Sequence, residues 1–264
     1  MPIRPASPSE YVIVSDPAPL RAARRWWWLA VTAMAMLVLG ACRSTAELKP
    51  HAGDQASAAD WETTPLPTKR PTRYTPQVID GRPVIQADAE SAVSLYRRRV
   101  NIAPGELGRL SFSWMVPELM ASADLSRSEA EDAPVRVVLA FDGDRSKLSY
   151  KNRLLSDLLE AVMGEEPPYA TLMYVWDNRA PLESVIIASR TDRIRKIVVD
   201  SGPTQTAIWR LHERDIASDY RRAFAEDPGA LISIALMTDS DNTRSTTRAY
   251  YGEVRLVGAN GRPQ

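Results

Sequence analysis

The clearest pattern in this chain is an alternation of apolar and polar positions. In residues 110–116 apolar side chains recur at every second position, namely at Leu110, Phe112, Trp114 and Val116. Because successive side chains of a strand point to opposite faces, these four share one face. The pattern predicts a strand with one face in a core, and it places Trp114 in that core.

Nine further stretches are rich in residues that favour β-strands. Several of them are separated by turn signals, such as Asp80-Gly81-Arg82-Pro83, Pro104-Gly105 and Ser201-Gly202-Pro203. They cover residues 84–87, 92–102, 135–141, 170–176, 184–188, 194–199, 206–211, 231–238 and 248–257. Short strands joined by turns predict a mainly β fold. We expect a jelly-roll-like antiparallel β-sandwich.

Two segments have helical spacing instead. Residues 148–163 repeat leucines three and four apart, and Gly164 with Pro167-Pro168 ends the pattern. Residues 216–226 place Tyr220 and Phe224 on one face. We expect two short peripheral helices that pack onto the edge or end of the sandwich.

The N-terminal part has the pattern of an export signal. An apolar run over residues 26–39 follows three arginines, Arg21, Arg24 and Arg25, and ends in Leu39-Gly40-Ala41-Cys42. This last motif resembles a lipobox. The run is shorter than the roughly 20 apolar residues of a spanning helix. We therefore predict a lipoprotein signal peptide over residues 1–41, with Cys42, the single cysteine, carrying the lipid.

The rest of the chain then divides into three parts. Residues 42–72 are rich in proline and charge without hydrophobic periodicity, which predicts a flexible tether. We expect the sandwich domain over residues 73–258 and a tail over 259–264. Arg43 stands where an aspartate retains enterobacterial lipoproteins at the inner membrane. It favours anchoring at the periplasmic face of the outer membrane, with the inner membrane as the alternative.

Composition narrows the chemistry. The chain has 33 basic and 33 acidic residues, so no strong field points to nucleic acid. His212 is the one histidine in the expected domain, which disfavours a histidine-based triad, although His212 stays a candidate base. No cysteine and histidine cluster suits zinc, and no glycine-rich loop suits phosphate. Calcium is the remaining candidate metal.

The best candidate site is the oxygen-rich segment 238–243 with Asp239, Asp241 and Asn242. It is no EF-hand, because Arg244 and Tyr250 occupy the positions that need glycine and glutamate. Two interpretations stay open. The preferred one is turn capping, and the other is a calcium or ligand site with Asp219 and Tyr220 nearby.

Three other features have a functional and a structural interpretation. Trp176 and Asp177 end a strand and open a polar loop, as a sugar-stacking site would, but a core tryptophan is favoured. The basic run 190–196 suits a solvated sheet face better than an anionic glycan. Carboxylates for a glycosidase could come from the acids Asp215, Asp219, Asp239 and Glu253.

Several motifs together resemble an uncharacterised family of bacterial envelope proteins, domain of unknown function 3047, over about residues 72–257. They are Asp132-Ala133-Pro134-Val135-Arg136-Val137-Val138, Leu172-Met173-Tyr174-Val175-Trp176, Val198-Val199-Asp200-Ser201-Gly202, Trp209, Arg214-Asp215-Ile216, Asp219-Tyr220, 237–243 and 250–254. The chain departs from the family pattern at Ala225 and Arg244, where glycine is usual. The final strand is also similar to that of galactose-binding-like jelly rolls. The resemblance implies fold and location and no activity.

We expect, on these grounds, a non-catalytic binding module anchored to the membrane through lipidated Cys42, for an envelope glycan or another envelope component. One alternative is a glycan hydrolase with paired carboxylates. The other is a structural partner of an envelope protein assembly.

Overall fold

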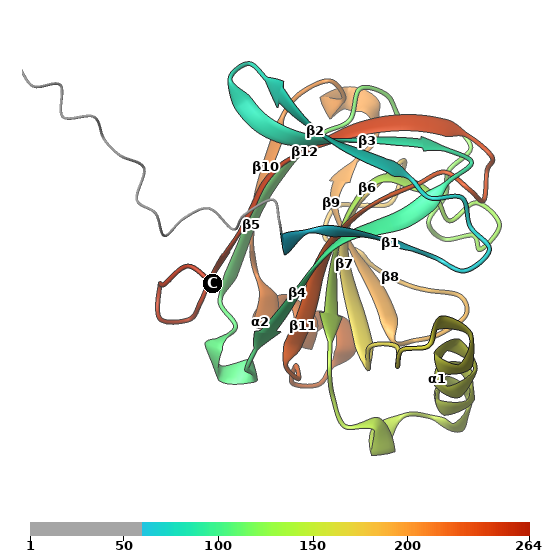
Figure 1. Ribbon diagram of the computed structural model, residues 1–264, viewed down its shortest axis with the longest axis vertical. Coiled ribbons are helices and arrows are strands. Elements are labelled where there is room, and N and C mark those ends of the chain that lie inside the picture. Colours follow the sequence, from blue (N-terminus) through green and yellow to red (C-terminus); the bar gives the residue numbers. More distant parts are fainter. Residues whose placement is uncertain (1–59) are drawn as a thin grey trace, which may run out of the picture. The chain divides into compact units, whose positions relative to one another are not determined.

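The computed structural model describes residues 60–264 and contains two stacked β-sheets (Figure 1). The larger has seven strands in the order β1 (Glu62–Pro65), β4 (Val93–Ile102), β11 (Leu231–Asp239), β6 (Ala133–Phe141), β7 (Ala170–Asp177), β9 (Ile194–Ser201) and β8 (Val185–Ile187). The smaller has the order β10 (Arg210–Asp215), β5 (Arg109–Met115), β12 (Thr246–Val257), β3 (Arg82–Glu90) and β2 (Arg73–Ile79). Neighbours are antiparallel except β7 and β9. The predicted mainly β sandwich is confirmed.

The main core lies between the two sheets. Trp114 is fully buried beside Phe112 and Leu110, as the alternation in β5 predicts. The ring of Phe112 lies 5.0 Å from that of Trp114 and 5.5 Å from that of Tyr174 in the opposite sheet. Such aromatic contacts between sheets bury large apolar areas, so this cluster anchors the sandwich.

A second apolar layer covers the outer face of the larger sheet. Val138, Met173 and Val198 belong to it, and Leu125 from the connection between β5 and β6 packs on them. Strands β6 and β7 are therefore buried on both faces. A charged side chain that points outward from these strands is buried under the connection instead of meeting water, and this matters for the site described below.

Three strands differ from the sequence prediction. β10 begins at Arg210, because residues 206–209, where the strand was expected to begin, form a turn and a bend after the 3-10 helix of residues 203–205. β2 was not predicted, and its Pro76 is tolerated because β2 is an edge strand. β1 lies within the predicted tether, so the predicted boundary at residue 73 is too late. Residues 1–41 and Cys42 lie outside the described residues.

Two α-helices complete the fold. α1 (Tyr150–Met163) starts at Ser149, whose hydroxyl accepts from the backbone N–H of Asn152, and ends at Gly164 with φ 72°. α2 (Ile216–Phe224) starts at Asp215 and packs against β9 and β10. The expectation of packing is correct for α2 but wrong for much of α1, whose apolar face is largely exposed.

Both departures from the family pattern fall at left-handed backbone positions. Ala225, after α2, has φ 57°, and Arg244, between β11 and β12, has φ 54°. For a residue with a Cβ atom, this left-handed backbone conformation costs roughly 1–2 kcal/mol in conformational free energy. The glycines that are usual there would avoid this strain.

Among residues 60–264, no helix combines the length and the apolar character needed to cross a membrane.

Candidate functional site

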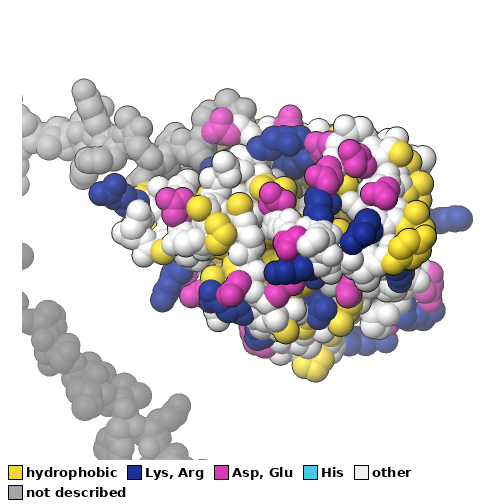
Figure 2. Space-filling model, turned by 90° about the horizontal axis from the view of Figure 1, so that it is seen from below, with side chains coloured by type: hydrophobic (Ala, Val, Ile, Leu, Met, Phe, Trp, Pro, Cys, Tyr) yellow, Lys and Arg dark blue, Asp and Glu magenta, His cyan; other side chains and the backbone are white. Residues whose placement is uncertain are grey.

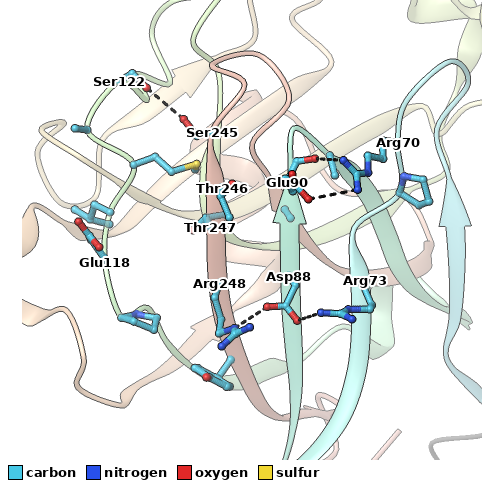
Figure 3. Close-up of a pocket in the computed structure, with 18 residues that line it drawn as sticks. Arg70, Arg73, Asp88, Glu90, Glu118, Ser122, Ser245, Thr246, Thr247 and Arg248 are labelled. Atoms are coloured by element: carbon cyan, nitrogen blue, oxygen red, sulfur yellow. Dashed lines mark hydrogen bonds and ion pairs between the residues drawn. The ribbon is translucent and has the colours of Figure 1, made fainter.

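A groove runs between the first half of β12 and the chain segment that follows β5 (Figure 3). Its volume is 1080 Å³. Strands β2, β3 and β12 contribute one side, and residues 117–122 contribute the other. The groove therefore forms where the chain leaves the smaller sheet after Met115 and no longer pairs with β12.

An ion-pair row crosses the strands of this groove. Asp88 of β3 accepts from Arg73 Nη2 of β2 at 3.0 Å and from Arg248 Nε of β12 at 2.6 Å, and Gln86 Nε2 adds a bond at 2.8 Å. Partial burial alone would raise the pKa of Asp88, but the hydrogen bonds from Gln86, Arg248 and Arg73 outweigh it and lower this pKa. Asp88 is thus a fixed carboxylate.

The groove is lined by equal numbers of basic and acidic side chains. The basic side chains are Arg70, Arg73 and Arg248, and the acidic ones are Asp88, Glu90 and Glu118. Arg70 binds Glu90 through its carboxylate and its backbone carbonyl, both at 3.4 Å. The lining has no net charge, so it offers donors and acceptors side by side without selecting a charged ligand.

The β12 side of the groove also has unused polar groups. Residues 246–249 pair with β3 on one side, but no strand of the described chain pairs with their other side. Thr247 is 6% exposed, and its Oγ1 has no hydrogen-bond partner among the described residues. The Thr247 side chain shares the buried face of β12 with Ala249 and Tyr251, whereas Arg248 and Tyr250 are on the outward face, so a ligand in the groove would meet these two instead.

The loop singled out in the sequence forms a separate carboxylate cluster. Asp239 and Asp241 converge with Asp132, which precedes β6, and one carboxylate oxygen from each lies within 4.8 Å of the others. Asp239 is 4% exposed and Asp132 is 1% exposed. Asp132 comes from a different part of the chain, so the loop does meet a further oxygen donor.

Basic side chains neutralise this cluster. Arg136 Nη2 lies 3.0 Å from Asp239 Oδ2, Lys69 pairs with Asp241, and the buried Lys196 Nζ lies 2.5 Å from Glu131 Oε1. Four carboxylates thus face three cations.

The pKa values of Asp239 and Asp241 are shifted in opposite directions. Burial raises the pKa of Asp239 well above its ordinary value, the nearby Arg136 opposes this, and the hydrogen bond with Asp241 and the charge of Asp132 add to the rise. For Asp241, burial raises the pKa, but the bonds from Lys69 and Asp239 outweigh it and lower this pKa. Of this pair, Asp239 is therefore the acid that keeps its proton to the higher pH.

Within the loop, Asp239 Oδ1 accepts from the backbone N–H of Asp241 at 3.4 Å, and the other bonds that hold the turn come from Asp132, which the sequence analysis did not single out. Asp132 accepts from the backbone N–H groups of Asn242 at 3.1 Å and of Thr243 at 2.7 Å, and Asn242 Nδ2 donates to Ser128 O at 2.7 Å. The carboxylates are held by Arg136, Lys69 and backbone donors, which are the partners that a calcium ion would have to displace.

Asp219 and Tyr220 are not brought to this loop. Both belong to α2, at the opposite end of β11 from the 240–245 connection (Figure 1). Asp219 Oδ2 accepts from Arg214 Nε at 2.8 Å and from the Tyr174 hydroxyl at 3.0 Å. Tyr220 is buried, and its hydroxyl donates to Glu226 at 3.1 Å. These residues hold α2 against the sheets.

Trp176 and Asp177 serve the fold as well. Trp176 is 1% exposed, and its Nε1 donates to Gly202 O at 3.1 Å, which fits the favoured core interpretation. Asp177 accepts from the backbone N–H groups of Arg179 at 2.7 Å and Ala180 at 2.6 Å. It caps the turn after β7.

His212 belongs to another buried network. Its Nε2 lies 2.8 Å from Asp200 Oδ2, and the same carboxylate accepts from Trp114 Nε1 at 2.7 Å. The His212 ring also packs 5.1 Å from Phe112. Asp200 thus links β9 to both β5 and β10 across the sandwich, and His212 has a structural partner in place.

The basic run is only partly a solvated face. Arg193 lies over the Tyr169 ring at 4.1 Å and pairs with Glu226. Lys196 is completely buried, which contradicts the expectation of solvent exposure. The reason is the connection between β5 and β6, which covers this part of β9 and supplies Glu131 to pair with the ammonium group.

The sequence analysis missed the groove. Its ion-pair row needs β2, which the pattern did not predict, and it joins residues 73, 88 and 248 from distant parts of the chain. The one local signal is the alternation in residues 246–251, which places Arg248 and Tyr250 on the outward face of β12.

Comparison with known proteins gives a family but no activity. A search of curated proteins finds no match. A solved structure similar to this chain is the xyloglucanase domain of NopAA, a type three effector from Sinorhizobium fredii, in complex with cellobiose, with 10% identity and a TM-score of 0.41 over 75% of this chain and 92% of that one. The model of a protein family of unknown function, DUF3047, matches residues 59–255. The chain therefore belongs to the DUF3047 family.

Proposed function

We propose that this protein is a lipid-anchored envelope protein whose sandwich domain binds a neutral glycan in the groove between β12 and residues 117–122, without hydrolysing it. The observation that carries the proposal is the groove itself, with a charge-balanced row of donors and acceptors beside an unpaired strand edge.

This lining suits sugar hydroxyl groups. Each hydroxyl both donates and accepts, so it needs donors and acceptors close together. Arg73 and Arg248 each use one N–H on Asp88, which leaves their other N–H groups for a ligand. Tyr250 offers a half-buried ring at the same groove. A volume of 1080 Å³ is at the upper end of small-molecule sites, about 300–1,000 Å³, and suits several sugar units.

Binding is favoured over hydrolysis because the groove lacks a suitable acid. A glycosidase needs a carboxylic acid with a raised pKa next to a second carboxylate. In the groove, the pKa of Asp88 is lowered by its bonds to Gln86, Arg248 and Arg73. The acid with the raised pKa, Asp239, is buried and does not line the groove.

To test binding, the full chain is titrated with neutral and anionic envelope oligosaccharides by calorimetry. We expect Tyr250→Ala to lose affinity for a neutral oligosaccharide, whereas Tyr150→Ala, at an exposed tyrosine on α1, retains it. Equal affinities of the two variants would overturn the site. Release of reducing ends would establish a hydrolase instead, and capture of envelope proteins without sugar would favour an assembly role.

The anchor is tested separately. The motif Leu39-Gly40-Ala41-Cys42 supports lipidation at Cys42. We expect cells to incorporate an alkyne palmitate analogue into the wild-type protein, and a Cys42→Ala protein to stay unlabelled and uncleaved. An unlabelled wild type would refute the anchor and leave the groove unaffected.

A further inference from the structure

Helix α1 exposes a continuous apolar stripe. Tyr150 is 82% exposed, Leu154 58%, Leu158 60% and Val162 59%. These positions are four residues apart, so they form one row along the helix. In Figure 2 apolar side chains gather at the right-hand end of the molecule, the side on which Figure 1 places α1. A stripe of this kind is unusual on a helix that packs on a sandwich.

Polar side chains attach the helix to the domain. Asn152, its one buried residue, donates to Asp192 at 2.5 Å and accepts from Thr191 at 2.9 Å. Ser156 accepts from Arg145 Nη1 at 3.1 Å. The side that turns to the protein also carries the half-buried Leu155, Leu159 and Met163. The exposed stripe is therefore a second apolar side, in addition to the side that packs on the domain. This orientation indicates that the stripe meets an apolar surface outside the domain.

The stripe lies near the point where the chain enters the domain. Arg97 binds Glu165, just after α1, at 2.9 Å and Glu62 of β1 at 3.5 Å. The C-terminal end of α1 and the start of β1 are therefore neighbours. Asp60 follows Cys42 by eighteen residues, a length that spans at most about 65 Å when fully extended. An anchor at Cys42 would therefore limit the distance between the membrane and the end of the domain at which α1 ends.

We propose that α1 lies in the membrane interface, with Tyr150, Leu154, Leu158 and Val162 in contact with lipid. This inference rests on the proposed lipid anchor. At 100° per residue, Lys151 lies between Leu158 and Val162 around the helix axis, where its ammonium group can reach lipid phosphate. A helix of this type adds a second membrane contact to the lipid on Cys42 and would fix the orientation of the domain on the membrane surface.

A second copy of the chain fits the stripe less well. A stable interface buries about 800 Å² on each partner. The α1 stripe has four side chains along a helix of 14 residues, about 21 Å long. Lipid, in contrast, needs no complementary shape.

The test uses the full chain, purified with its lipid and reconstituted in phosphatidylethanolamine and phosphatidylglycerol vesicles. Lipidation consumes the Cys42 thiol, so Leu158→Cys or Glu160→Cys introduces a single reactive thiol for an environment-sensitive fluorophore. We expect the label at 158 to shift to shorter wavelength and to be quenched by brominated lipids. The label at 160, on the polar side of the same helix, should show neither change.

Equal emission and quenching at both positions in vesicle-bound protein would overturn the proposal. A shift at 158 that depends on protein concentration and needs no vesicles would assign the stripe to a second copy, and would overturn it as well. Failure of the anchor itself looks different, because Cys42 would then take up a second label. In that case, a shift in the emission of the label at 158 on adding vesicles would still support the lipid contact. The absence of such a shift would refute it.

Discussion

The carboxylate cluster and the groove are built from the same pair of residue types with opposite results. In the cluster, Arg136 and Asp239 are 3% and 6% exposed in their side chains, and they pair at 3.0 Å. In the groove, Arg248 is 52% exposed and Asp88 18%, and they pair at 2.6 Å. The contacts are similar, and burial is what differs.

Burial decides which of the two can meet a ligand. Charges removed from water must be matched within the protein, and in the cluster this takes three cations. Nothing there is free to bind a ligand without a large loss. In the groove, water already satisfies the spare N–H groups of Arg73 and Arg248, so a sugar hydroxyl can replace it at little cost.

The largest difference between the regions should appear when one arginine is removed from each. Arg136→Ala leaves four acidic groups with two cations in a buried site, and we expect a loss of about 3–5 kcal/mol in the free energy of unfolding. Arg248→Ala removes an exposed partner and should cost about 0.2–1 kcal/mol. Urea unfolding of both variants measures this difference.

A control separates charge from shape at the buried site. In Arg136→Met with Asp239→Leu, both charges are replaced by apolar groups, and this protein should be more stable than Arg136→Ala. If Arg136→Ala costs no more than Arg248→Ala, the cluster is hydrated and the comparison fails.

The two regions should also respond to pH with different signs. The folded pKa of Asp239 is raised by burial, so the folded state holds a proton that the unfolded state releases above about pH 4. Stability is therefore lost as the pH rises toward the folded pKa, by up to about 1.4 kcal/mol per pH unit. Relative to Asp239→Asn, the wild type should become less stable between pH 5 and the folded pKa.

The groove carboxylate provides the matched control. The pKa of Asp88 is lowered by its bonds to Gln86, Arg248 and Arg73, so its contribution is present above about pH 4 and is lost only as the pH falls through the lowered value. The difference between wild type and Asp88→Asn should be constant above pH 5. The prediction would be wrong if, above pH 5, the stability difference changed with pH for Asp88→Asn and stayed constant for Asp239→Asn.

The same contrast explains what the sequence could predict. Period-two alternation in β5 located the core and Trp114, because one face of that strand is buried and the other is polar. Strands β6 and β7 are buried on both faces, so their pattern gives no sign that Arg136 and Lys196 lie under a covering segment. The segment that covers a sheet comes from a distant part of the chain, so local periodicity cannot predict it.

The candidate sites were predicted in the same uneven way. The oxygen-rich segment 239–242 identified real neighbours, since the carboxylates of Asp239 and Asp241 lie within 4.8 Å of each other. Their partners Asp132 and Lys69 are more than a hundred residues away in the chain, and no local motif marks them. For α1, the leucine spacing predicted a helix correctly, but it does not tell which leucines face outward, as Leu154 and Leu158 do.

A smaller effect is expected from two threonines, one in each region. Thr238, beside the cluster, donates to Pro134 O at 2.8 Å and lies 2.9 Å from the Tyr251 hydroxyl, so Thr238→Val should cost about 1–3 kcal/mol. The Thr247 hydroxyl has no such partner, so Thr247→Val should be neutral or slightly stabilising. Thermal unfolding distinguishes them. A Thr247→Val protein that is as unstable as Thr238→Val would show that its hydroxyl already has a partner.

The smallest expected effect is that of calcium. Three carboxylates that converge within 4.8 Å would suit this ion by ligand type, but Arg136 and Lys69 already bring positive charge to the same oxygens and would repel it. A site occupied at one hundred times its dissociation constant would add about 2.7 kcal/mol to the free energy of unfolding, so even moderate binding is measurable. We therefore expect the melting temperature of the wild type to be the same with calcium and with a chelator. The double variant Asp239→Asn with Asp241→Asn should also show no difference. A calcium-dependent rise in the wild type that disappears in the double variant would mean that the ion displaces Lys69, and the cluster would then be a ligand site like the groove.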